Sequence, residues 1–189
     1  MKRTYLLLSA ALFLLTGVAS AETPIFQSRQ VGPQNDRIAV KVYTNQSEYK
    51  VGEKMDISLK ANADSYFMLY YIDSKGNAQV IVPSEFSSNN RLKKNALFHV
   101  RDNKGRMLEQ KGPDGYERLQ VIATKTPIKL SDLKDSVDPS TGEVYKPDVF
   151  IAEVTRSLSD RVEQKRGVGP QKDSAYGEFG MAEITYTVR

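Results

Sequence analysis

The stretch Ser65–Glu85 reads SYFMLYYIDSKGNAQVIVPSE, and its pattern decides the fold. Every side chain in Tyr66–Ile72 is aromatic or apolar, which is typical of a strand that is covered on both faces. Asp73 and Gly76 follow as turn residues, because Asp can accept hydrogen bonds from turn N–H groups and Gly can adopt a positive φ. Residues 78–83 are mostly apolar again and return as a partner strand. The stretch therefore predicts a β-hairpin whose first strand is central in a sheet.

Strands with one apolar face surround this hairpin. Residues 55–61 read MDISLKA, in which apolar and polar side chains alternate, and residues 37–43, 96–100 and 117–124 carry similar patterns. In the last of these, Leu119, Val121 and Ala123 share one face. Short strands separated by turns rich in Gly, Pro and Asn predict a mainly β protein, an antiparallel β-sandwich that is immunoglobulin-like or related.

A helical pattern appears only toward the C-terminus. Residues 147–166 place Ile151, Val154, Leu158 and Val162 at helical spacing, which predicts one C-terminal helix packed on or beside the sandwich. Residues 130–135 are expected to form one helical turn and residues 137–146 a loop. The Gly-rich stretch 167–180 is a second expected loop, and 181–188 is the closing strand. Residues 37–189 are thus expected to form a single domain.

The N-terminus has the three parts of a secretory signal peptide. Lys2 and Arg3 precede an apolar run over residues 5–18, and Ala19-Ser20-Ala21 forms a small-x-small cleavage site. The run is shorter than the roughly 20 residues that a spanning helix needs, so the alternative of an uncleaved anchor is disfavoured. We expect residues 1–21 to be removed and residues 22–36 to be a flexible lead-in. The expected location is bacterial, exported, and either periplasmic or extracellular.

Composition excludes several kinds of chemistry. The chain has no Cys, which rules out disulfides and Cys-ligated metals, and its single histidine, His99, lies within an expected strand. The net charge is +4, but Lys and Arg are interspersed with Asp and Glu, which does not favour a nucleic-acid surface. We expect no metal, no cofactor and no disulfide.

Carboxylates are the remaining groups that could perform acid–base catalysis. A glycosidase needs two of them facing each other across a cleft. The candidates lie in turns or on the expected wet faces of strands, where a solvated carboxylate is ordinary, and no spacing favours any pair: Asp56, Glu85, Asp102, Asp114 and Glu117. A hydrolase is therefore the third of three functional alternatives, and the chain is expected not to be an enzyme.

Aromatic residues offer the two binding hypotheses. Tyr66 and Tyr70 lie on one face of the central strand, where they could form a sugar or peptide platform, although burial in the core explains most of that cluster. Tyr176 and Phe179 lie in the Gly-rich loop, where they could anchor a protein partner, although local packing is an alternative. The first hypothesis for function is an exported, non-catalytic binding or assembly module that contacts another envelope or secreted protein. The second is a glycan- or peptidoglycan-binding module.

A chain of motifs from Tyr49 to Thr124 resembles the domain of unknown function 4384 family. The motifs are YKVGE, the Tyr-led apolar strand ending in Asp-x-x-Gly, Val82-Pro83, NRLK, GPDG, and the strand LQVIAT. The resemblance covers roughly residues 38–127 and departs from the family after the Pro-ended strand, where a Phe-Pro-Asn order is usual and this chain has Val82-Pro83-Ser84. It implies a fold, and an exported or envelope context, but no activity.

Overall fold

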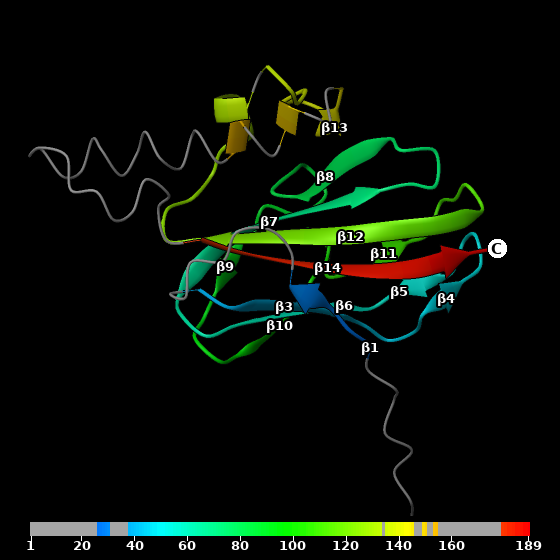
Figure 1. Ribbon diagram of the computed structural model, residues 1–189, viewed down its shortest axis with the longest axis horizontal. Coiled ribbons are helices and arrows are strands. Elements are labelled where there is room, and N and C mark those ends of the chain that lie inside the picture. The colour runs from blue at the N-terminus through cyan, green and yellow to red at the C-terminus, as the bar shows by residue number, and fades with distance from the viewer. Residues whose placement is uncertain (1–25, 31–37, 134, 146–148, 151–152, 155–178) are drawn as a thin grey trace, which may run out of the picture.

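The computed structural model describes residues 26–30, 38–133, 135–145, 149–150, 153–154 and 179–189 (Figure 1). The expected signal peptide lies outside these residues, and so do most of the expected helix 147–166 and Tyr176. The described part is mainly β, and nearly all strand pairs are antiparallel, as the sequence predicts. None of its helices is long and apolar enough to cross a membrane.

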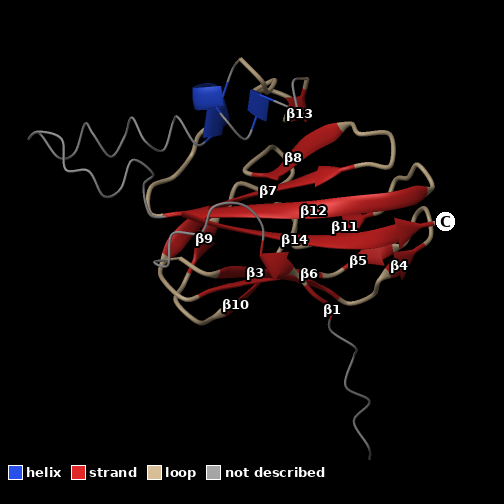
Figure 2. Cartoon of the chain, viewed as in Figure 1, coloured by secondary structure: helices blue, strands red, loops and turns tan. Residues whose placement is uncertain are grey.

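Two larger sheets and one strand pair make up the fold (Figure 2). Sheet A has the order β1 (Phe26–Gln27), β3 (Val40–Thr44), β6 (Ile57–Ala61), β10 (Leu97–His99). Sheet B has the order β13 (Glu143–Val144), β8 (Ala78–Val82), β7 (Ser65–Ile72), β12 (Gly115–Thr124), β14 (Phe179–Val188), β2 (Arg29–Gln30). In addition, β9 (Arg91–Leu92) pairs with β7, and β4 (Glu48–Tyr49) pairs with β14 in the parallel direction. The separate pair is β11 (Leu108–Glu109) with β5 (Lys54–Met55).

The predicted hairpin is confirmed. Strand β7 lies between β8 and β12 and is buried along most of its length. Asp73 Oδ1 accepts hydrogen bonds from the N–H groups of Lys75 (2.9 Å) and Asn77 (2.8 Å), and Gly76 has a φ of 87°. The carboxylate and the glycine therefore set the turn as the sequence indicates.

The main core lies where one face of sheet A meets one face of sheet B. Val42 and Leu59 come from sheet A, Leu69 and Val121 come from sheet B, and all four are fully buried. Strand β3 contacts both β12 and β14 across this core. Burying such side chains stabilises the fold by about 25 cal/mol for each Å² of apolar surface, and in the absence of disulfides this packing is the main support.

The opposite face of sheet B is covered by described residues between positions 128 and 154. Met68, Tyr70 and Ile122 pack there against Leu133 and Phe150. The expected helical turn is present as the 3-10 helix η1 (Leu130–Leu133). The expected loop 137–146 instead contains β13, which adds to β8. Within the expected helix 147–166 the described residues 149–150 and 153–154 have helical backbone, which does not establish a helix of the predicted length.

Residues 26–30 form a strap that joins the two sheets. Phe26 pairs with Thr44 in sheet A, and Arg29 pairs with Glu183 in sheet B, where the two side chains form an ion pair of 3.1 Å. This strap falls within the range that the sequence predicts as a flexible lead-in. The two strands of the strap, β1 and β2, are only two residues long. They are too short to show side-chain alternation, so the sequence does not reveal the strap.

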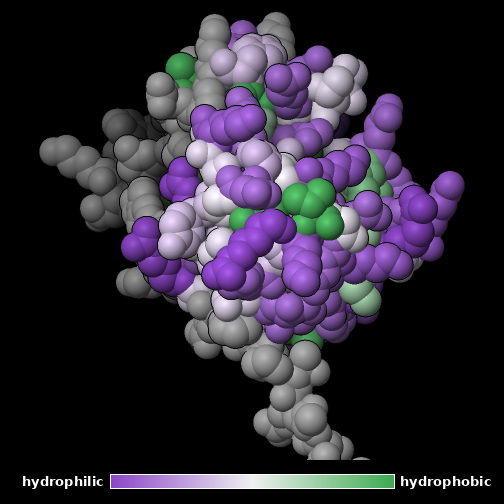
Figure 3. All heavy atoms as spheres, turned by 90° about the vertical axis from the view of Figure 1, so that its right-hand side faces the viewer, coloured by the Kyte–Doolittle hydropathy of each residue, from purple (hydrophilic) through white to green (hydrophobic). Residues whose placement is uncertain are grey.

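The end of the molecule that carries the C-terminus is mostly hydrophilic. Figure 3 shows this end with a small hydrophobic patch near its centre and scattered hydrophobic residues among mostly polar side chains. It therefore offers little apolar surface for a stable contact.

Candidate functional site

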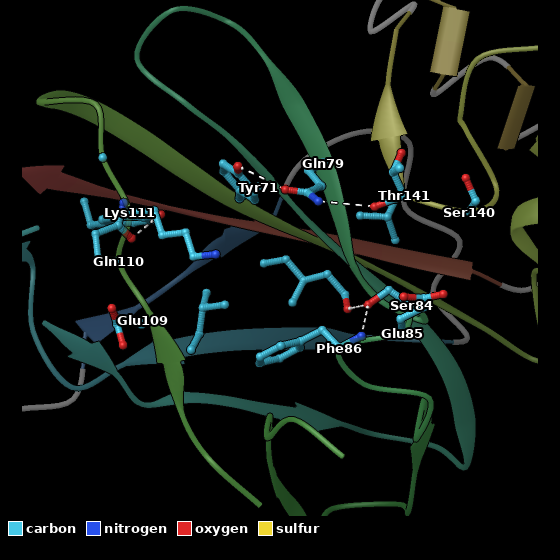
Figure 4. Close-up of a pocket in the computed structure, with 15 residues that line it drawn as sticks. Tyr71, Gln79, Ser84, Glu85, Phe86, Glu109, Gln110, Lys111, Ser140 and Thr141 are labelled. Carbon is cyan, nitrogen blue, oxygen red and sulfur yellow. Dashed lines mark hydrogen bonds between the residues drawn. The ribbon is translucent and has the colours of Figure 1, made fainter. Parts of the chain in front are cut away.

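A pocket of about 360 Å³ is lined by residues of β7, β8, β11, β14 and the loops beside them (Figure 4). Its lining comes from stretches that are far apart in the sequence: Tyr71, Gln79–Ile81, Ser84–Phe86, Leu108–Gly112, Ser140–Thr141 and Tyr186. Val80, Ile81, Phe86 and Leu108 supply apolar surface, and hydroxyl, amide and charged groups supply the rest. A pocket with this mixture suits a small polar ligand that also has an apolar face.

Hydrogen bonds hold one wall of the pocket in place. The Tyr71 hydroxyl donates to Gln79 Oε1 at 3.2 Å, and Gln79 Nε2 donates to the Thr141 carbonyl at 3.2 Å (Figure 4). Burial, with the negative charges of Asp73 and Glu117, raises the pKa of Tyr71. The Tyr71 hydroxyl is therefore neutral at physiological pH and serves as a hydrogen-bonding group.

The carboxylates of the pocket do not form a hydrolytic pair. Glu85 and Glu109 both line it, and Figure 4 shows them well separated at its two ends. Lys111 lies nearer to Glu109 in the same view. Glycosidic hydrolysis needs an acid and a second carboxylate on either side of one scissile bond, so this arrangement gives it no support.

Glu117 lies in the core. The expectation that this carboxylate faces water is therefore wrong. Its side chain is fully buried, because strand alternation places it on the same face as Leu119 and Val121. Its Oε2 accepts hydrogen bonds from Gln110 Nε2 (2.6 Å) and from the Tyr186 hydroxyl (2.7 Å). Its Oε1 has no partner among the described residues.

Burial raises the pKa of Glu117, although the bonds from Tyr186 and Gln110 partly offset the effect. Burial and the neighbouring Glu117 charge also raise the pKa of Tyr186. Gln110 and Tyr186, which donate to Glu117 Oε2, both line the pocket, so Glu117 supports the pocket wall from the core. Alternation from Leu119 back to Glu117 is the sequence signal that identifies this residue.

His99 does not form a catalytic triad. Ser58 Oγ (3.4 Å) and Asp56 Oδ1 (3.2 Å) both approach the same ring nitrogen, Nδ1, whereas a triad uses the two nitrogens for different partners. Arg101 donates to Asp56 at 2.8 Å. Burial raises the pKa of Asp56, but the bonds from Arg101 and His99 outweigh it and hold the pKa below its ordinary value. The cluster is a partly exposed ion-pair network.

The aromatic residues singled out from the sequence lie in different environments. Tyr70 is buried, donates its hydroxyl to Gln120, and packs edge to face on Phe150 with ring centroids 4.9 Å apart. Phe179 is buried as the first residue of β14, which begins two residues earlier than the predicted strand 181–188. Tyr66 is partly exposed and lies opposite Arg91. Tyr70 and Phe179 therefore present no free ring to a partner in this structure, and Tyr66 alone forms no platform.

A second surface lies at the β10 edge of sheet A, where no described strand pairs further. Arg91, Lys93 and Lys94 are exposed and line an open depression of about 570 Å³ together with Leu97 and Phe98. Leu97 is a large apolar residue with 52% of its surface exposed, whereas Phe98 packs on Phe67. We call this surface, with Lys60 beside Leu97, the basic edge. Arg91 and Lys93 fall within the NRLK motif, Lys94 follows it, and Lys60 comes from β6, but the sequence does not reveal that these cations lie next to an edge strand.

No group of three or more His, Asp or Glu in the described part of the chain is arranged to hold a metal ion.

Comparison with known proteins finds a family model that matches part of the chain. No curated protein and no solved structure matches the chain. The family model described as Domain of unknown function (DUF4384) matches residues 48–127, from β4 to just beyond β12. The matched segment supplies the whole basic edge and most of the pocket, whereas Ser140, Thr141 and Tyr186 come from outside it. The resemblance that the motifs between Tyr49 and Thr124 indicate, to the domain of unknown function 4384 family, is thereby confirmed for residues 48–127.

Proposed function

We propose that the protein is an exported, non-catalytic binding module of the bacterial cell envelope that contacts another protein through a sheet edge. In this proposal the two sheets are the layers of an antiparallel β-sandwich, immunoglobulin-like or related. The observation that supports the contact is the position of β10, which ends the strand order of sheet A.

The register of β10 indicates which backbone groups are free. Val100 N donates to Ile57 O at 2.9 Å, so Val100 and Ile57 are at a hydrogen-bonded position of the strand pair. Bonded and non-bonded pairs alternate in an antiparallel ladder, so Phe98 is also bonded to β6, whereas Leu97 and His99 direct their N–H and C=O groups outward. An extended segment of another protein can add to these groups as a further strand.

A photo-crosslinking residue at position 97 tests this proposal in the native envelope. Ultraviolet light should link position 97 to one discrete envelope or secreted protein. As a control, the same photo-crosslinking amino acid is placed at position 75, in the turn that follows β7. It should not link that protein. Equal crosslinking at both positions, or none at position 97, would contradict the proposed contact.

Glycan binding is the second candidate, and the pocket favours it. Tyr71 and Phe86 offer aromatic surface, and Gln79, Glu109 and Thr141 offer hydrogen-bonding groups, which is the combination that sugars use. Tyr71 thus takes the role that the sequence suggests for Tyr66 and Tyr70.

Binding of purified, soluble peptidoglycan fragments, measured by calorimetry, tests the second candidate. The variant Tyr71→Ala should abolish binding, whereas Tyr116→Ala, which removes a 75% exposed tyrosine outside the pocket, should not. Equal binding by both variants would exclude the pocket as the glycan site.

A further inference from the structure

The outer face of sheet A carries an unusual pairing of like charges. Lys41 in β3 lies directly opposite Lys60 in β6, and both side chains are exposed. Lys60 in turn lies opposite Leu97 at the edge. Cross-strand neighbours have Cβ atoms about 4.5–5.5 Å apart, and like charges at that distance are destabilising. The row from β3 to β10 therefore concentrates positive charge instead of alternating its sign.

The charge continues beyond the edge into the depression lined by Arg91, Lys93 and Lys94. None of the five cations of this row and depression forms an ion pair with a described residue. They are Lys41, Lys60, Arg91, Lys93 and Lys94. Asp64 is the one carboxylate in the lining, and its Oδ1 accepts a hydrogen bond from the backbone N–H of Lys94 at 2.7 Å, which fixes the turn. Among the described residues, the basic edge and Lys41 thus place five cations with no ion-pair partner beside strand groups that no described strand pairs.

From this coincidence we propose that the basic edge binds an extended, acidic segment of the partner protein as an added strand on β10. This inference rests on the proposed function, since it specifies the chemistry of the partner at the same edge. Backbone bonds to Leu97 and His99 hold the segment, and carboxylates on it neutralise the lysines and Arg91. An isolated anionic polymer satisfies the charge but not the backbone groups, so the observations favour a polypeptide.

The geometry also specifies the spacing of the acidic residues. A strand rises about 3.4 Å per residue and its side chains alternate between faces, so carboxylates at every second position lie about 7 Å apart on one face. That face continues the Lys41–Lys60–Leu97 row. The expected segment therefore has Asp or Glu at alternate positions, with no Pro where an N–H must pair.

The test uses three labelled eight-residue peptides and the mature protein, with binding measured by fluorescence anisotropy. The first alternates Glu and Thr, the second alternates Lys and Thr, and the third is the Glu peptide with N-methyl groups on alternate residues. We expect the Glu peptide alone to bind. Because each exposed charge pair contributes about 0.2–1 kcal/mol, Lys93→Gln with Lys94→Gln should weaken its binding roughly 2- to 30-fold. Lys75→Gln with Lys104→Gln, in two exposed turns, is the matched control and should leave it unchanged.

A second variant separates backbone pairing from charge. Leu97→Pro removes an N–H that faces the free edge and leaves all basic side chains in place, so it should abolish binding while the circular dichroism spectrum stays native. Equal binding of the Glu and N-methylated peptides would overturn strand addition in favour of an anionic polymer site. Binding of neither Glu nor Lys peptide at millimolar concentration would overturn the acidic assignment. If position 97 nevertheless crosslinks a partner in the envelope, the proposed function stands with a partner of different chemistry.

Discussion

Replacing Gly180 with Ala should destabilise the protein, although the same exchange stabilises many strands. Gly180 lies in β14 opposite Ala123, and its backbone runs close to Ile38. A Cβ atom at position 180 would lie 2.1 Å from the Ile38 carbonyl oxygen and 3.0 Å from its carbonyl carbon. The obstacle is main chain, so no side-chain rotation relieves it.

Two opposing effects set the magnitude of this change. Gly→Ala at a compatible position stabilises by about 0.4–1 kcal/mol, because it restricts the unfolded chain. Forcing an extra carbon into a packed site costs about 1–3 kcal/mol through shifts of the backbone and side chains. The second effect should dominate, so we expect a net loss of about 1–2 kcal/mol in the free energy of unfolding.

Urea denaturation followed by circular dichroism measures this loss, and an unchanged m-value would show that the comparison is valid. Ile38→Val shortens the neighbouring side chain and should not rescue Gly180→Ala, because the clash is with the carbonyl group. A variant as stable as the parent protein, or more stable, would refute the close approach of β14 to Ile38.

Four further results are expected. Leu69→Ala should lower the free energy of unfolding by about 2–5 kcal/mol in the same assay, since Leu69 is fully buried between the sheets; a change near zero would contradict its central position. Burial raises the pKa of Glu117 above its ordinary value of 4.5. Protonated Glu117 therefore contributes fully to the free energy of unfolding below pH 4.5, and this contribution is lost as the pH rises through the folded-state pKa. Denaturation across this range should therefore show a decline in stability that Glu117→Gln removes, and parallel curves would be inconsistent with a raised pKa. Phe179→Ser should lower the melting temperature by several degrees, because the ring is buried; an unchanged melting curve would return Phe179 to the list of surface anchors. The intact mass of exported protein should correspond to cleavage after Ala21, and a full-length mass would refute the signal peptide.

Local patterns predict much of the sheet structure. The apolar run in β7 and the alternation in β6 and β12 are strong sequence signals. Burial determines the kind of side chain at nearly every position of these strands. The turn at Asp73 and Gly76 is equally local. By contrast, β1, β2 and β13 are two residues long and arise from main-chain pairing with strands that are already in place, so no periodicity marks them.

The candidate sites are less predictable because they are assembled from distant residues. The pocket joins Tyr71 to Thr141 and Tyr186, and the cover over Tyr70 comes from residues 128–154. Because this cover comes from a distant part of the chain, the sequence alone does not show which aromatic residues it buries. Glu117 is different, because alternation from Leu119 places it inside, and only the general expectation that carboxylates are solvated argues against it.

The pairing of β12 with β14 has a consequence for the order in which the chain folds. The two strands are joined along their full lengths, yet the bonded residues Glu117 and Tyr186 are 69 positions apart (Figure 1). Contacts between distant residues form slowly, because the intervening chain must first lose its conformational freedom. During that delay β7 and β12 can pair with each other, while the other edge of β12 is open and β14 is still unplaced. We therefore expect a lag between hairpin formation and closure of the sheet, in which the nascent protein is most exposed to proteases and to aggregation and most dependent on chaperones.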